Sequence, residues 1–166
     1  MDNDADLLVF SDGSGYKDGY GGWSAICCTP ERNMKTFRMG STFGLSVDRA
    51  EMTGMLEGLE MALSISRVLP KAMTIEGWKP MVNVYTDREN MVLSIKGVYD
   101  RSNCPDLWRR FEHYEKHLNI VAIHVFRETD FPEFVQCDLN ASTGRLIAKS
   151  YVEAMALPDF TLPMFK

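Results

Sequence analysis

The chain has 166 residues, which is enough for one domain with a sizeable core and too little for two full domains. Hydrophobic residues make up 45% and charged residues 25%, a composition that excludes disordered, collagenous and fibrous proteins. The formal charge of −5 excludes a bulk positive field that would attract nucleic acid, so a polyanionic partner must be held locally or through metal ions.

The first part of the chain predicts three strands joined by short links. Residues 7–10 form an unbroken apolar run typical of a buried strand, and the glycine-rich residues 11–15 predict a turn. Residues 21–28 predict a second strand, and residues 34–43 alternate polar and apolar side chains like a strand with one solvated face. The short links indicate an antiparallel meander.

Helices and strands alternate in the rest of the chain. Apolar residues recur every three or four positions after Asp48, which predicts a helix on the sheet up to about Val68, followed by a loop up to Pro80. The remaining predicted elements are a strand, two helices, a strand and a last helix, over residues 81–86, 88–96, 104–116, 120–126 and 132–155. A helix between successive strands implies a parallel crossover, so we predict an α/β fold of order βββαβααβα.

The cysteine pattern and the N-terminus indicate a cellular compartment. The four cysteines form no C-x-x-C pair in a chain too large to need disulfides, so we expect reduced thiols at Cys27, Cys28, Cys104 and Cys137. Residues 1–6 are acidic where a targeting peptide would be basic, and no apolar run approaches bilayer length. We therefore expect a cytoplasmic protein.

Four carboxylates lie at the ends of the predicted elements: Asp12, Glu51, Asp87 and Asp138. If the first and fourth strands are neighbours, Asp12 and Asp87 meet. Grouped without cations, such carboxylates would repel one another and be driven to protonate. Two hard divalent cations, Mg²⁺ or Mn²⁺, would cancel this charge, and a pair about 4 Å apart suits phosphodiester cleavage. The group therefore predicts a two-metal nuclease site.

Each acid taken alone also has a structural explanation. Asp12 could bond its own backbone in a turn, Asp87 could cap the helix that follows it, and Asp48 with Glu51 fits a capping box. Asp138 could be a solvated charge on a helix surface. Only the joint pattern favours a functional site.

The joint pattern resembles ribonuclease H of type 1, the family that cuts the RNA strand of RNA/DNA hybrids. The resemblance spans residues 8–148. Its pieces, in chain order, are Phe10-Ser11-Asp12-Gly13-Ser14, Gly21-Gly22-Trp23, Arg49-Ala50-Glu51, Tyr85-Thr86-Asp87, Asp106-Leu107-Trp108 with Arg110, and Cys137-Asp138 before Ala141. The resemblance implies a five-stranded mixed sheet flanked by helices, made of the antiparallel meander and two parallel strands. It also implies that the catalytic, metal-binding residues are Asp12, Glu51, Asp87 and Asp138, with two ions per site.

The resemblance further implies where a hybrid would bind. Gly13, Ser14 and Arg49 should lie along the RNA strand, where backbone amides and side chains meet phosphates and 2′-hydroxyls. Ser46 and Asn103 should lie near a pocket for a DNA-strand phosphate, although the segment that carries Asn103 is one residue longer than in the family. We expect Trp108 to be a core residue, together with Met52, Met55 and Met61.

Two features of the family are missing from this sequence. Residues 127–132 contain no histidine where the family often has one that assists product release or proton transfer, and His124 is expected to be a satisfied sheet histidine. Residues 99–103 stand where some members carry a basic helical protrusion that grips the hybrid. Substrate binding should therefore be weak and assisted by metal.

The implied activity is endonucleolytic hydrolysis of the RNA strand of hybrids, giving 5′-phosphate and 3′-hydroxyl ends, by a monomer whose domain spans residues 1–157. Two alternatives stay open. One is another nuclease of the same fold, because exonucleases, resolvases and transposases share it, and the other is an inactive interaction module.

Residues 158–166 form a tail rich in proline and large apolar residues. One interpretation is a strap packed back on the domain. The other is that residues 161–165 resemble the peptides that dock in the apolar pocket of the bacterial sliding clamp, with Leu162, Met164 and Phe165 as anchors and Thr161 in place of the usual glutamine.

Overall fold

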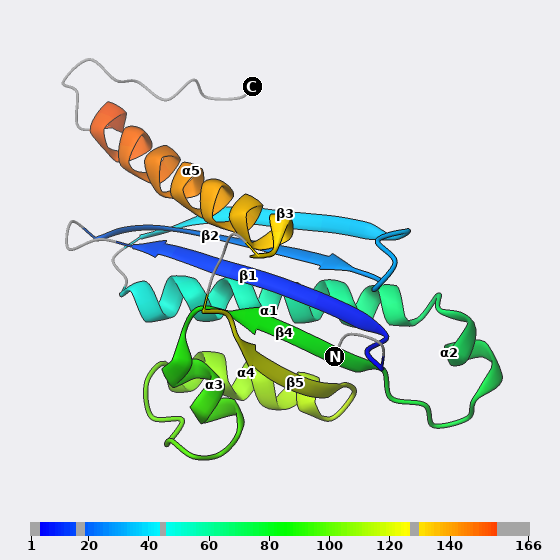
Figure 1. The fold of residues 1–166 in the computed structure, drawn as a ribbon. Coiled ribbons are helices and arrows are strands. Elements are labelled where there is room, and N and C mark those ends of the chain that lie inside the picture. The colour runs from blue at the N-terminus through cyan, green and yellow to red at the C-terminus, as the bar shows by residue number, and fades with distance from the viewer. Residues whose placement is uncertain (1–3, 16–18, 44–45, 127–129, 156–166) are drawn as a thin grey trace, which may run out of the picture.

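A five-stranded mixed sheet with strand order β3-β2-β1-β4-β5 is the centre of the computed structural model, which describes residues 4–15, 19–43, 46–126 and 130–155 (Figure 1). The strands are β1 (Leu7–Gly15), β2 (Tyr20–Cys28), β3 (Lys35–Phe43), β4 (Met81–Thr86) and β5 (Asn119–His124). The helices are α1 (Val47–Ser66), α2 (Pro70–Thr74), α3 (Glu89–Ile95), α4 (Pro105–Glu115) and α5 (Pro132–Met155). Strands β1 to β3 pair antiparallel, and β4 and β5 continue the sheet parallel to β1. The predicted fold class is confirmed.

Helices cover both faces of the sheet, with α1 and α4 on one side and α5 on the other (Figure 1). The side chains of β1 therefore point alternately into the two hydrophobic cores, one on each face of the sheet. Leu7 and Val9 pack in the core under α1 and α4, whereas Leu8 and Phe10 pack in the core under α5. Burial on both faces explains why residues 7–10 of β1 are continuously apolar instead of alternating.

Two glycines let the backbone of α1 approach the backbone of the sheet. A Cβ added to Gly13 would lie 2.3 Å from the backbone nitrogen of Glu51. A Cβ added to Gly54 would lie 2.9 Å from the carbonyl oxygen of Ser24 and 3.1 Å from that of Asp12. This close packing places the N-terminal part of α1, and Glu51 with it, directly on β1.

Strand β1 continues through the segment that the sequence predicts as a turn. Residues Ser11 to Gly15 pair with β2, with Asp12 opposite Ser24 and Gly15 opposite Gly21. The turn prediction was wrong because glycine is typical of turns, whereas Gly13 and Gly15 are strand residues that allow close packing against α1. Asp12 is therefore a strand residue.

The predicted helix caps also differ from the structure. Helix α1 begins at Val47 with Ser46 as its N-cap and has no side-chain cap bond, so the capping box of Asp48 and Glu51 is not formed. Helix α3 begins at Glu89 with Arg88 as its N-cap, again without a side-chain cap bond. The structural explanations of Glu51 and Asp87 as capping residues are thereby removed. A short helix, α2, replaces part of the predicted loop after Val68.

Other predictions hold where the structure describes them. Trp108, Met52, Met55 and Met61 are buried, and all four cysteines are free thiols. No helix in the described ranges has the length and apolar character needed to cross a bilayer. The tail at residues 158–166, and residues 127–129 of the loop without histidine, lie outside the described residues.

Candidate metal centre

Three carboxylates meet where β4 ends. The parallel register between β1 and β4 pairs Phe10 with Tyr85, and continuing it by two residues sets Asp12 beside Asp87. Glu51 reaches the same point from α1. The three side chains each offer an oxygen atom, and these atoms all lie within 4.8 Å of one another. The structure therefore brings together three of the four predicted metal ligands.

The burial of Glu51 disfavours the ionised form of its carboxyl group. Its side chain is 2% exposed. Burial raises the pKa of the Glu51 carboxyl well above its usual range, and the nearby charges of Asp12 and Asp87 add to this effect. The Arg88 side chain acts in the opposite direction, because its Nε donates a hydrogen bond to Oε1 of Glu51 at 3.0 Å.

Two carboxylate oxygens in the cluster are buried without a hydrogen-bond partner. Among the described residues no donor reaches Oε2 of Glu51 or Oδ1 of Asp87. Burying such groups without partners is unfavourable, and a bound cation would remove the penalty. Three carboxylates and no nitrogen or sulfur ligand form the donor set that hard divalent cations prefer. The cluster fits divalent metal binding.

His124 fixes the backbone at the same point. It is the last residue of β5, and its Nε2 hydrogen-bonds with the carbonyl oxygen of Asp87 at 2.9 Å. It is a satisfied histidine, as predicted, but its partner is the residue that carries a candidate ligand. The sequence did not show this contact, because it depends on how far β5 extends beside β4.

Asp138, the fourth predicted ligand, is not part of this group. It is exposed on α5 and contributes no oxygen to the cluster within 4.8 Å. Its neighbour Cys137 is buried, and the Sγ of Cys137 donates to the carbonyl oxygen of Phe10 at 3.3 Å. Since Phe10 precedes Asp12 by two residues, this contact sets Asp138 on α5 near the site end of β1.

The predicted substrate contacts lie in β1, at the start of α1 and just before α4. Gly13 and Ser14 are half-buried in β1, and Ser46 is exposed at the start of α1. Arg49 forms a bidentate ion pair with Asp106, in which one guanidinium nitrogen donates to Oδ1 of Asp106 at 2.8 Å.

Asn103 is exposed, and its Nδ2 donates to Asp48 Oδ2 at 2.7 Å. Without substrate, the amide of Asn103 is therefore paired with the carboxylate of Asp48.

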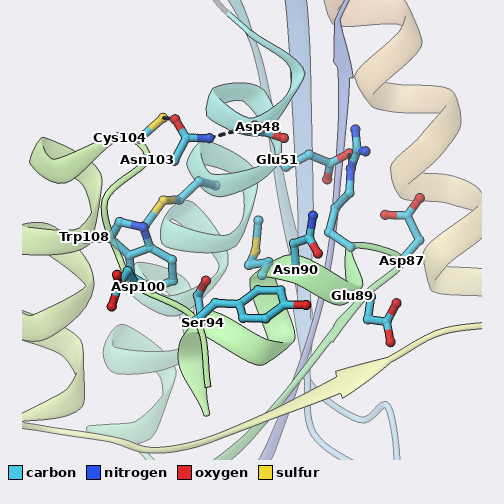
Figure 2. Close-up of a pocket in the computed structure, with 14 residues that line it drawn as sticks. Asp48, Glu51, Asp87, Glu89, Asn90, Ser94, Asp100, Asn103, Cys104 and Trp108 are labelled. Carbon is cyan, nitrogen blue, oxygen red and sulfur yellow. Dashed lines mark hydrogen bonds and ion pairs between the residues drawn. The ribbon is translucent and has the colours of Figure 1, made fainter. Parts of the chain in front are cut away.

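A pocket of about 460 Å³ lies between the acidic cluster and the segment that carries Asn103. Figure 2 shows Glu51 and Asp87 on one side of it and Asn103 and Trp108 on the other. The carboxylates of Asp48, Glu89 and Asp100 also line it, so its wall is strongly acidic.

The contact of Arg88 with Glu51 was not predicted. A base directly after the acid that ends a strand is a visible signal, but the sequence alone indicates only the start of a helix at Arg88. That signal becomes informative only when Glu51 is known to lie opposite.

No family model and no curated protein matches the chain, but solved structures match its fold. The N-terminal RNase H domain of rv2228c from Mycobacterium tuberculosis is 14% identical, with a TM-score of 0.69 over 88% of this chain and 97% of that one. LC11-RNase H1, solved in complex with an RNA/DNA hybrid, is 15% identical, with a TM-score of 0.68 over 86% and 99%. RNase H1 from the halophilic archaeon Halobacterium salinarum is 16% identical, with a TM-score of 0.62 over 83% and 96%. The strand order, the flanking helices and these similarities together show that the chain has the ribonuclease H-like fold.

Proposed function

We propose that this protein is a ribonuclease H that hydrolyses the RNA strand of RNA/DNA hybrids and leaves 5′-phosphate and 3′-hydroxyl ends. The observation that carries the proposal is the grouping of Asp12, Glu51 and Asp87 within 4.8 Å at one end of the central strands of a ribonuclease H-like fold. A buried group of like charges costs stability, so its presence favours a functional role over a structural one.

The three clustered acids together with Asp138 would hold the metal. Two divalent ions, Mg²⁺ or Mn²⁺, would be bound by Asp12 and Asp87, and Glu51 and Asp138 would each engage one. Such ions, when bound, activate a water molecule and stabilise the leaving oxygen. The protein holds these carboxylates in position by two contacts. One is the close approach of α1 to Gly13 of β1, and the other is the hydrogen bond of His124 with the Asp87 backbone. Asp138 completes this set from α5.

The substrate is a hybrid duplex held along the same end of the sheet. LC11-RNase H1, which shares the fold, was solved with an RNA/DNA hybrid, and this supports the same substrate class here. Gly13, Ser14 and Arg49 contact the RNA strand, and Ser46 and Asn103 contact the DNA strand. The acting unit is a monomer whose catalytic domain spans residues 1–157.

The test is digestion of an end-labelled RNA/DNA hybrid beside single-stranded RNA, duplex RNA and duplex DNA, each with Mg²⁺ and with a chelator. We expect cleavage of the hybrid RNA strand alone, dependent on metal and absent in Asp87→Asn. Cleavage of duplex DNA would favour another nuclease of the same fold. Binding of the hybrid without cleavage in Mg²⁺ or Mn²⁺ would favour an interaction module.

A further inference from the structure

The guanidinium of Arg88 lies inside the acidic cluster. Its Nε donates to Glu51 Oε1 at 3.0 Å, and the two side chains are 38% and 2% exposed. The Arg88 backbone is fixed as well, because its N–H donates to Oγ1 of Thr86 at 3.1 Å and the residue is the N-cap of α3. The base thus reaches the buried acid from the solvent side.

We propose that Arg88 is the counter-ion of the metal-free site and that a divalent cation at Glu51 weakens the Arg88 contact, so that the two cations compete for the charge of one carboxylate. This inference rests on the proposed function, because it concerns the same metal site. It assigns Arg88 a positioning role: it keeps the cluster assembled without metal and sets the cation concentration at which the site fills.

Competition follows from the chemistry of the two cations. An arginine side chain stays protonated at any pH of interest, so its charge cannot be removed by deprotonation. A cation that binds the partner-free Oε2 of Glu51 is repelled by the guanidinium that donates to Oε1 of the same carboxylate. By linkage, the Arg88 contact weakens cation binding by the same factor by which a bound cation weakens the Arg88 contact.

The pocket next to Glu51 has room for the Arg88 side chain when it leaves this carboxylate. Arg88 lines the pocket of about 460 Å³, and the carboxylates of Asp48, Glu89 and Asp100 line the same pocket. Figure 2 shows Asp48 beside Glu51, and Asp100 across the pocket from Asp87. An arginine that leaves Glu51 therefore has both space and acidic partners within the same cavity.

The test is calorimetric titration of Mg²⁺ into the full-length protein and three variants, in the absence of substrate. We expect Arg88→Gln to bind Mg²⁺ on the order of tenfold more tightly than wild type, because a unit charge next to the ion has been removed. Arg88→Lys keeps the charge and should stay near wild type. The charge-matched control is Arg38→Gln, since its partner Glu57 keeps Arg110, and it should leave Mg²⁺ affinity unchanged.

A second measurement uses wild-type protein, because Arg88→Gln leaves Glu51 without its base and could fold poorly. The ¹H–¹⁵N signal of the Arg88 Nε reports its hydrogen bond to Glu51 directly. We expect Mg²⁺ saturation to shift this signal to that of an unbonded guanidinium. The Nε signal of Arg101 should stay in place, because this atom donates to the carbonyl oxygen of Ser94 and the rest of the guanidinium pairs with Glu115, neither of which belongs to the cluster.

The outcomes separate this inference from the proposed function. Equal Mg²⁺ affinity of wild type and Arg88→Gln, with an unmoved Arg88 signal, overturns the competition and leaves the metal site standing. Absence of Mg²⁺ binding by every variant overturns the metal site and the competition together. Tighter binding by Arg88→Gln with no change in Arg38→Gln supports both.

Discussion

Replacing Glu51 by Gln should stabilise the metal-free protein. The ligand oxygens of Asp12, Glu51 and Asp87 lie within 4.8 Å of one another, and two unit charges at that distance repel by about 3 to 4 kcal/mol at an effective dielectric constant near 20. Glu51 faces two such repulsions, and Arg88, 3.0 Å away, attracts it by about 5 to 6 kcal/mol on the same scale. The repulsion that is left over is small, so we expect a gain of about 1 to 3 kcal/mol.

The same substitution should remove a pH dependence. Burial and two like charges raise the pKa of Glu51 in the folded state above its unfolded value. Between the two pKa values the folded protein holds a proton that the unfolded chain has lost, so the free energy of unfolding falls as the pH rises through that window. The loss is about 1.4 kcal/mol for each unit by which the two values differ, and Glu51→Gln should lack it.

Thermal unfolding in a chelating buffer, repeated across the acid range, measures both effects. At neutral pH the melting temperature of Glu51→Gln should rise by about 2 to 4 °C for each kcal/mol gained. The matched control is Glu57→Gln on the same helix, which should lose stability because Glu57 accepts hydrogen bonds from Arg38 and Arg110. An unchanged or lower melting temperature for Glu51→Gln, with the control behaving as expected, would refute the repulsion argument.

Three further predictions concern the helix contact, the binding surface and the tail. Gly13→Ala should lower the free energy of unfolding by about 1 to 3 kcal/mol in chemical denaturation, because the new Cβ would lie 2.3 Å from the backbone of Glu51, and no change would contradict the close packing. Hybrid affinity should fall only shallowly with salt in a binding titration, and a slope steeper than about −5, corresponding to roughly six phosphate contacts, would reveal a basic surface that we have missed. Deletion after Pro158 should lower the melting temperature if the tail is a strap, or abolish capture by a sliding clamp if it is a docking peptide, and no change in either measurement contradicts both.

The elements were predictable where side-chain periodicity and burial agree. Residues 81–86 are mostly apolar because both faces of β4 are covered, and the predicted strand matches the structure. Residues 11–15 failed because glycine is ambiguous in a sequence, since it allows turns and also permits close approach of two backbones. Only the position of Glu51 beside Gly13 resolves which of the two applies.

The candidate site was predictable in its acids and not in its partners. Asp12, Glu51 and Asp87 could be proposed together because each occupies the end of a predicted element, and neighbouring strand ends share one edge of a sheet. The Arg88 contact joins residues 37 apart in sequence, and so does the bond from His124 to Asp87. Such contacts depend on helix and strand register to within one residue, which no local pattern specifies.

The measurement that tests the central claim most directly is hybrid cleavage by Asp12→Asn and Asp87→Asn, compared with wild type at equal protein and Mg²⁺ concentrations. Circular dichroism of each variant provides the folding control. We expect both variants to fold and their cleavage rates to fall on the order of a thousandfold or more, because each substitution removes a carboxylate that positions the ions. Near wild-type cleavage by either variant would contradict the assignment of this cluster as the active site.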